Sequence, residues 1–494
     1  MIRIQINKRA VTLLILLFII TGGAALRLYK LDYQSLWNDE LTTIRRTGYD
    51  YLPDVITKGL NIHPPGLNVF YYFVTHIFGD SPVIVRMPAV LAGIASVYLI
   101  FLLACRLYSR KEGLISAALT AFLWCPVYYS QEARPYSLLI FLTLLVVWLL
   151  IRFIDRFGKG NKYSIYLLML YGFTAIICSY IHYFGTLFIF LLGVTALVYS
   201  FRRKQMFLRL LTVHLAVLAA FSFWIPGMFR QFTGEPSYIL DVHFIDFIYY
   251  FEFLFNWSEP LTKLVFFSYC FLFVYTIYRF TRRKKYKTPA KVFFSPEIML
   301  GLWMIAPFWI TYLISDIFVN VLTLKNLIIS LPPAYILFSR AITAAAVKPV
   351  FQFALSAVIL FLFLWNLLFT QDYYNTITKE QFREGIACIA EQDSRLDNSV
   401  VIGFAWHEDF FNYYFKRFDC QKRIELIAGE PADTIITGKY LAENNPHYVW
   451  YIRGHRPTAP EFTGFLERQL TLLDHKPFRG VDVWLFERKH KALR

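Results

Sequence analysis

Residues 131–152 read QEARPYSLLIFLTLLVVWLLIR, a polar motif followed by a long uncharged run and then an arginine. Crossing the hydrocarbon core of a bilayer, about 30 Å thick, takes roughly 20 predominantly apolar residues in a helix. The stretch therefore predicts a transmembrane helix that begins at a polar motif on one face of a membrane and ends at a basic residue on the other.

Segments of the same kind recur through the first 370 residues. Of the 494 residues, 57% are hydrophobic and 17% are charged, with a mean hydropathy of +0.45. An average soluble domain is about 45–50% apolar and about 25% charged, so the composition excludes a soluble enzyme, a disordered scaffold and a coiled coil. We predict an all-α polytopic membrane bundle of about 11 transmembrane helices, near residues 10–28, 87–106, 113–130, 136–152, 163–181, 183–200, 207–226, 262–279, 297–315, 323–340 and 350–369.

The basic residues between these segments indicate the orientation. Of the 50 Lys and Arg residues, 23 lie in six short clusters that hold only two acidic residues. An excess of Lys and Arg in alternate short loops is the positive-inside signal of a membrane protein, so the net charge of +16 indicates no nucleic-acid partner. We expect a cell (inner or plasma) membrane, a cytoplasmic N-terminus and a retained first helix rather than a signal peptide. The clusters are residues 1–10, 106–112, 152–162, 201–209, 279–291 and 340–348.

One apolar segment is too short to cross a bilayer. Residues 67–78 are only 12 long and include His76, and counting them as a span would place the basic loop 106–112 outside. We therefore expect an interfacial helix within a long first extracytoplasmic loop, residues 29–86.

The tail alternates short β-type runs with helical stretches such as residues 407–415. This alternation predicts a small α/β domain, which the orientation places outside the cell. The expected division is a membrane region at 1–370 and an extracytoplasmic domain at 371–494. The β-type runs are residues 399–404, 423–428, 447–452 and 481–486.

Two adjacent carboxylates, Asp39 and Glu40, follow the first predicted span. Such a pair at the outer membrane surface suits a general base and a partner that positions substrate or binds a metal. A solvated acidic loop is the alternative interpretation.

A Pro-Pro pair precedes the interfacial segment, within NIHPPG at residues 61–66. Proline fixes φ and cannot continue a helix, so Pro64 and Pro65 set the direction in which the next helix begins. His63, directly before them, faces either a polar cavity or the surface.

The QEARPY motif joins the third and fourth predicted spans at the outer boundary. The planar fork of an arginine matches phosphate oxygens, which makes Arg134 a candidate phosphate ligand with Glu132 and Tyr136 beside it. Alternatively, Glu132 and Arg134 neutralise each other and anchor the turn.

Two more candidates lie at outer ends of spans. Lys325, at the start of the tenth span, either contacts an anionic headgroup or extends to the interface. His182, between the fifth and sixth spans, is a candidate for a supporting role.

The order of these motifs resembles that of the GT-C membrane glycosyltransferases over roughly residues 10–370. The closest branch contains the dolichyl-phosphate-mannose protein mannosyltransferases and the bacterial aminoarabinose transferases that act on lipid A. The shared features, in order, are the Asp-Glu pair after the first helix, the first Pro-Pro segment, Arg86-Met87-Pro88 at the second span, QEARPY after the third, and Leu331-Pro332-Pro333.

The resemblance implies transfer of a sugar from a polyprenyl-phosphate donor to an acceptor outside the cytoplasm, which is a protein, lipid A or another glycan. It implies that Asp39 is the base or orients the acceptor with Glu40 as its partner, and that Arg134, Lys325 and His63 contact the donor phosphate. A stable phosphate leaving group needs fixed positive charge rather than a strong acid, and a single displacement inverts the anomeric centre. No cofactor is assigned, and a divalent metal is left open.

The sequence departs from the family pattern at two positions. Bacterial relatives often have Lys before the first Pro-Pro, where this chain has His63, and Arg-Tyr where it has Lys325-Asn326. Two other classes of function remain as alternatives: a transporter or flippase of lipid-linked sugars, and a non-catalytic subunit of polysaccharide assembly. A transporter favours charged residues in mid-span and repeated or broken helices.

Of the six cysteines, Cys388 and Cys420 lie in the tail. Thiols in an oxidising compartment tend to pair, so we predict a disulfide between them. No cysteine pair has the spacing of metal ligands.

Overall fold

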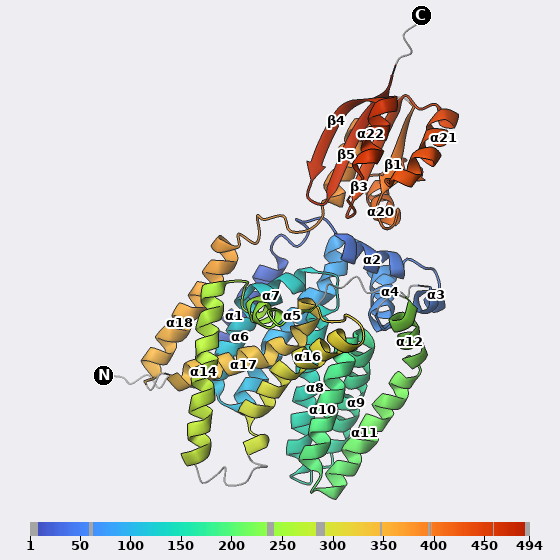
Figure 1. Ribbon diagram of the computed structural model, residues 1–494. Coiled ribbons are helices and arrows are strands. Elements are labelled where there is room, and N and C mark those ends of the chain that lie inside the picture. The colour runs from blue at the N-terminus through green and yellow to red at the C-terminus, as the bar shows by residue number, and fades with distance from the viewer. Residues whose placement is uncertain are drawn as a thin grey trace, which may run out of the picture. The chain divides into compact units, whose positions relative to one another are not determined.

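The computed structural model describes residues 8–58, 63–234, 242–282, 292–345, 348–393, 396, 398–457 and 459–489. These residues form two compact units, which Figure 1 shows. The helical unit comprises Met1–Tyr29, Asp50–Ile77 and Ile84–Tyr373. The sheet unit comprises Lys30–Tyr49, Phe78–Val83 and Tyr374–Arg494. Two segments of the predicted first loop therefore belong with the tail.

The helical unit is built of long apolar helices joined by short turns. Figure 1 shows α8, α9, α10 and α11 running side by side. The helices of this unit are α1 (Lys8–Leu28), α3 (Leu52–Thr57), α4 (Gly66–Phe78), α5 (Pro82–Leu107), α6 (Arg110–Phe122), α7 (Trp124–Tyr128), η1 (Tyr129–Gln131), α8 (Tyr136–Phe157), α9 (Ser164–Ile181), α10 (Tyr183–Ser200), α11 (Lys204–Ser222), α12 (Ile225–Gly234), α13 (Asp246–Leu254), α14 (Glu259–Arg282), α16 (Pro296–Ile317), η3 (Leu324–Ser330), α17 (Leu331–Ala345), α18 (Pro349–Trp365) and η4 (Asn366–Thr370).

The prediction of about eleven spans is confirmed with one difference. In the described chain ten helices are long and apolar enough to cross a membrane, and an eleventh arises if one bent pair is counted as a single span. That pair is the third predicted span, in which α6 and the α7–η1 segment meet at 57°. The third span is therefore broken rather than straight.

A buried arginine from α1 stabilises this break. The backbone leaves the helix at Leu123, which is extended, and the last carbonyls of α6 lose their intrahelical donors there. Arg27, fully buried, donates to the carbonyls of Thr120 at 2.7 Å and Ala121 at 3.0 Å, and to the hydroxyl of Ser130 at 3.0 Å. The guanidinium thus supplies the hydrogen bonds that the broken helix lacks.

A glycine on α5 makes room for this arginine. A Cβ atom at Gly93 would lie 2.2 Å from the Ser130 hydroxyl oxygen and 2.8 Å from Nε of Arg27. Both distances are shorter than the contacts that Cβ atoms make in proteins, so a side chain at Gly93 would displace the guanidinium from the break.

The predicted short helix at residues 67–78 is confirmed as α4, which has 13 residues. At 1.5 Å per residue it is about 20 Å long, shorter than a hydrocarbon core. Its position at the membrane surface stays a prediction.

The sheet unit contains a five-stranded mixed sheet in the order β2-β1-β3-β5-β4. The first three strands in that order are parallel, and β5 pairs antiparallel with both β3 and β4. The elements of the unit are α2 (Asn38–Thr47), α19 (Phe382–Asp393), β1 (Ser399–Phe404), α20 (Asp409–Arg417), β2 (Leu426–Ile427), η5 (Pro431–Asp433), α21 (Thr434–Asn444), β3 (Tyr448–Gly454), α22 (Pro460–Gln469), β4 (Leu470–Phe478) and β5 (Val481–Arg488).

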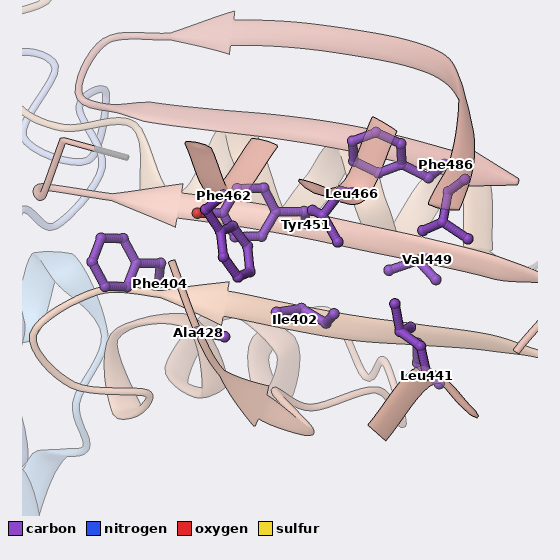
Figure 2. Close-up of a cluster of buried hydrophobic side chains, with 11 residues drawn as sticks. Ile402, Phe404, Ala428, Leu441, Val449, Tyr451, Phe462, Leu466 and Phe486 are labelled. Atoms are coloured by element: carbon purple, nitrogen blue, oxygen red, sulfur yellow. The ribbon is translucent and has the colours of Figure 1, made fainter. Parts of the chain in front are cut away.

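Alternate residues of the central strands pack on opposite faces of the sheet. Tyr451 of β3 belongs to the apolar core that Figure 2 shows, together with Leu441 of α21 and Leu466 of α22. Its neighbour Trp450 faces α19 and donates to the Asp393 carboxylate at 3.2 Å. Helices therefore cover both faces, and the prediction of a small α/β domain is confirmed.

The strand predictions hold for the centre of the sheet and fail at its edges. The predicted runs 399–404, 447–452 and 481–486 correspond to β1, β3 and β5, whereas the run 423–428 contains only the two-residue strand β2. The edge strand β4 was not predicted. Its side chains are largely exposed, and its register shifts between Leu472 and Asp474, so no simple alternation is visible.

The predicted disulfide is wrong, because both tail cysteines are free thiols. Cys388 lies on α19, where it accepts a hydrogen bond from Gln392 at 3.7 Å and faces Lys476 of β4. Cys420 follows α20, and its amide donates to the carbonyl of Phe415. The two thiols belong to different elements with different neighbours.

Candidate active site

The QEARPY motif is a buried turn at the start of α8. The exposed fractions are 1% for Glu132, 6% for Arg134 and 1% for Tyr136. The Arg134 amide donates to the Glu132 carbonyl at 2.8 Å, which tightens the turn. Glu and Arg are almost never fully buried unless something engages them, so this turn is a strong candidate for a site.

Next to α8, His182 caps helix α10. Its Nδ1 accepts a hydrogen bond from the Phe184 amide at 3.2 Å, so the ring proton is assigned to Nε2. His182 is 1% exposed, and its Nε2 has no hydrogen-bond partner among the described residues. The α9–α10 turn is tight, since a Cβ at Gly185 would lie 2.2 Å from the Cys178 carbonyl oxygen. The turn therefore holds a buried N–H donor in a fixed direction.

The Pro-Pro-Gly segment brings His63 to this turn. A Cβ at Gly66 would lie 2.5 Å from the Tyr180 carbonyl oxygen, so the start of α4 packs directly on the end of α9. The rings of His63 and His182 are 4.4 Å apart between centroids. Two histidines that are 119 positions apart in the sequence thus form one cluster.

Lys325 joins the cluster from η3, which packs on α8 and α10. Its Nζ lies 6.0 Å from the centre of the Tyr136 ring, a cation–π distance. Half-buried among these helices, Lys325 does not simply extend into solvent.

Burial lowers the pKa of His182, in the connection between α9 and α10, to about 3, and the positive charges of Arg134 and Lys325 lower it further. The ring is therefore neutral at pH 7. The structure brings together six predicted residues of the helical unit: His63, Glu132, Arg134, Tyr136, His182 and Lys325. They include two cations, one carboxylate and one neutral N–H donor. Such a set binds an anion with several oxygen acceptors, for example a phosphate.

Asp39 and Glu40 lie in the sheet unit, in the first turn of α2. The N-terminus of a helix favours negative charge. Glu40 is fully buried and forms an ion pair with Lys379, in which Nζ of Lys379 lies 3.1 Å from Oε2 of Glu40. Asp39 is only partly buried, so its carboxylate is the one of the two that remains accessible.

Two tail residues that the sequence analysis did not identify, Glu380 and His455, support the start of α2. Glu380 accepts from the Asn38 amide at 3.3 Å through one oxygen, and its other oxygen lies 2.7 Å from Nδ1 of His455. The hydrogen bond to Glu380 raises the pKa of His455, and the charges of Glu380 and Asp39 raise it further. The acidic turn is therefore held by a network of Lys379, Glu380 and His455.

No sequence signal connects these tail residues with Asp39, because they are more than 300 positions away and match no motif. In the described residues, no three His, Cys, Asp or Glu side chains gather where they would hold a metal.

Comparison with protein families finds one match. Residues 62–224 match the model of the dolichyl-phosphate-mannose-protein mannosyltransferase family. This segment includes His63, the QEARPY turn and His182. Among curated protein sequences, none matches the chain.

Comparison with solved structures extends the likeness to nearly the whole chain. The apo form of ArnT from Cupriavidus metallidurans is 12% identical, with a TM-score of 0.59, and the alignment covers 95% of this chain and 97% of that one. The same protein bound to undecaprenyl phosphate gives a TM-score of 0.53 at 12% identity and the same coverage. The apo oligosaccharyltransferase of Archaeoglobus fulgidus gives 0.53 at 12% identity, covering 90% of this chain and 70% of that one.

These comparisons confirm the expected fold. The helical bundle with a small sheet domain is the architecture of the solved ArnT structure, and the chain is a multi-pass membrane protein. The chain is thus similar to the dolichyl-phosphate-mannose-protein mannosyltransferase family over residues 62–224 and to the solved ArnT structure in its fold.

Proposed function

We propose that this enzyme transfers a sugar from a polyprenyl-phosphate donor to an acceptor on the outer side of a cell membrane, with inversion at the anomeric carbon. The acceptor is a hydroxyl or amino group of a protein, lipid A or another glycan. The N-terminus is cytoplasmic and the sheet unit is extracytoplasmic, as the basic loops favour.

The observation that carries the proposal is the cationic cluster of the helical unit. Arg134 and Lys325 are close enough to His182 to act on its pKa, and all three belong to buried or half-buried turns. The neutral imidazole presents Nε2–H to an incoming oxygen without adding a third buried charge. Arg134 and Lys325 balance the phosphate charge, and His182 and His63 complete its surroundings.

The chemistry requires one base and a stabilised leaving group. The acceptor oxygen or nitrogen attacks the anomeric carbon while its proton passes to the Asp39 carboxylate. The bond between the anomeric carbon and the phosphate oxygen breaks, and its electron pair leaves with the polyprenyl phosphate. Arg134 and Lys325 stabilise the charge that develops on that oxygen.

Glu40 has a positioning role in this scheme. Its buried pair with Lys379 fixes the first turn of α2, and the contact of Glu380 with the Asn38 amide fixes the residue before Asp39. The reactive carboxylate is thereby held on a rigid element, as catalysis requires.

The test is transfer by purified protein from a panel of polyprenyl-phosphate sugars. Asp39→Asn keeps the size of the side chain and deletes the base, so we expect a loss of about 10²–10⁴-fold with donor binding retained. Asp32→Asn is the matched control, because Asp32 is an exposed carboxylate of the same segment whose only described ion pair is with Arg383 at 3.7 Å. Wild-type transfer rates in Asp39→Asn would rule out this residue as the base.

A further inference from the structure

An apolar groove lies at the end of the helical unit that carries the basic loops. Its volume is about 480 Å³, and it runs between α8, α10 and α16 to the end of α5. The Arg106–Asp155 ion pair, 2.5 Å between its closest atoms, lies at its end. Its apolar lining includes Val147, Ile151, Phe188, Leu192, Met299 and Trp303.

A polar cavity adjoins this groove. Its volume is about 440 Å³, and Leu107 lines both spaces. The cavity is surrounded by the ends of α5, α14 and α17 and the starts of α6 and α18. Its polar lining includes Tyr108, Lys111, Glu112, Arg279, Arg340 and Thr343. An elongated apolar space therefore meets a compact polar one.

The charges around the cavity leave a positive excess. Glu112 accepts from Arg340 at 3.0 Å and from Thr343 at 2.8 Å. Arg279 donates to the buried Glu297 at 2.9 Å. The two arginines thus neutralise the two carboxylates, while the Lys111 ammonium contacts the amide oxygen of Gln352.

Several buried polar atoms at this cavity have no hydrogen-bond partner among the described residues. They are the Tyr108 hydroxyl, Nε of Arg279 and Nε of Arg340, which belong to lining residues, and one oxygen of Glu297, which pairs with Arg279. Buried polar groups in proteins are nearly always hydrogen-bonded. Three of the four atoms are donors, which matches a ligand that carries acceptor oxygens.

This cavity is distinct from the cationic cluster around Arg134. Arg134 precedes the first turn of α8, whereas Asp155 lies in its last turn. A helix of 22 residues is about 33 Å long, so the two sites are separated by the thickness of a hydrocarbon core.

We propose that this end of the bundle binds an anionic phospholipid of the surrounding bilayer, with the headgroup phosphate in the polar cavity and one acyl chain in the groove. Basic pockets between transmembrane helices on the cytoplasmic side are typical sites for anionic headgroups. The elongated apolar groove suits an acyl chain, and the polar cavity beside it suits the phosphate of the same lipid.

The first test is lipid binding to the detergent-purified full chain, measured by native mass spectrometry with phosphatidylglycerol and with zwitterionic phosphatidylcholine. We expect phosphatidylglycerol to bind preferentially, and Lys111→Gln to weaken its binding about fivefold, the usual effect of one basic residue at an anionic lipid. Lys159→Gln, in an exposed loop outside the cavity, should leave binding unchanged. Equal binding of the two lipids, or equal effects of the two substitutions, would overturn the proposal.

The second test addresses the groove. Leu192→Trp fills it from α10, whereas Val194→Trp places the same bulk on the exposed face of that helix. Only the first should reduce phosphatidylglycerol binding. Free inorganic phosphate should compete poorly, because it gains nothing from the groove.

Two outcomes would exclude a phospholipid as the occupant. Complete displacement of phosphatidylglycerol by inorganic phosphate at similar concentration would mean that the groove contributes nothing. A loss of polyprenyl phosphate binding in Lys111→Gln, with phosphatidylglycerol binding intact, would assign the cavity to the donor lipid instead.

Discussion

The charged side chains at the two ends of helix α8 differ in how deeply they are buried. At its start, Glu132 and Arg134 are nearly inaccessible, and residues from three other segments gather beside them. At its end, Asp155 pairs with Arg106 while their side chains remain 27% and 48% exposed. Exposed ion pairs contribute little to stability, whereas charge buried at membrane depth is expensive and marks function. The difference supports the proposal that the donor phosphate binds at the start of α8.

The largest effect on stability should come from the arginine that holds this reactive end together. Arg27→Leu leaves the carbonyls of Thr120 and Ala121 without their donor, and each such buried group costs about 1–3 kcal/mol. We expect a loss of several kcal/mol, seen as a much lower thermal midpoint in detergent. Arg156→Leu, an exposed arginine at the other end of α8, should have almost no effect. Equal midpoints for the two variants would contradict the role of Arg27.

The next prediction distinguishes two roles of His182, the cap of α10 and the hydrogen-bond donor to the phosphate. Asn at position 182 can still cap α10 but lacks Nε2–H, whereas Ala lacks both groups. A hydrogen bond to a charged group contributes about 1.5–3 kcal/mol, so both variants should slow transfer about 10- to 100-fold, and only His182→Ala should lower the thermal midpoint. A wild-type rate of sugar transfer by His182→Asn would show that His182 only caps α10 and does not donate to the phosphate. Because its pKa is near 3, His182 should not titrate in the rate profile between about pH 5 and 8.

The smallest effect concerns the sheet unit and depends on pH. Its hydrogen bond to Glu380 raises the pKa of His455 above the ordinary value of 6.5. A raised pKa in the folded state stabilises the protein fully below pH 6.5, and the contribution is lost as the pH rises through the folded value. We expect wild type to exceed His455→Gln in stability by less than about 1 kcal/mol at pH 6, and the difference to vanish at high pH. A difference that does not change with pH would show that this pair is not linked to protonation.

The sequence predicted the helices and strands that consist of a nearly continuous run of apolar residues. The spans and the buried strands β1, β3 and β5 are nearly continuous apolar runs, so they stand out. The edge strand β4 carries Asp474, His475 and Lys476 on a largely exposed surface and gives no such signal. The break at Leu123 was missed although it has a local signal, since Pro126 has no N–H to donate to the carbonyl of Phe122. Arg27, which stabilises the break, lies about 95 positions away and is packed against it only in three dimensions.

The site was predictable where it rests on motifs. Arg134, His182 and His63 were identified by type and position, and the structure brings them together. Lys379, Glu380 and His455 were not, because nothing local marks a residue that acts through a contact across the fold. The wrong disulfide has the same origin, since two thiols in one domain say nothing about distance.

The central claim is that the buried cations at the start of α8 bind the donor phosphate, and one binding measurement tests it. Arg134→Ala and Arg156→Ala make the same change at opposite ends of one helix, and Arg134→Lys keeps the charge without the planar fork. For a polyprenyl phosphate added to purified protein, we expect Kd to rise about 10- to 100-fold in Arg134→Ala, less in Arg134→Lys, and not at all in Arg156→Ala. An Arg134→Ala protein that folds and binds the lipid as tightly as wild type would contradict the account.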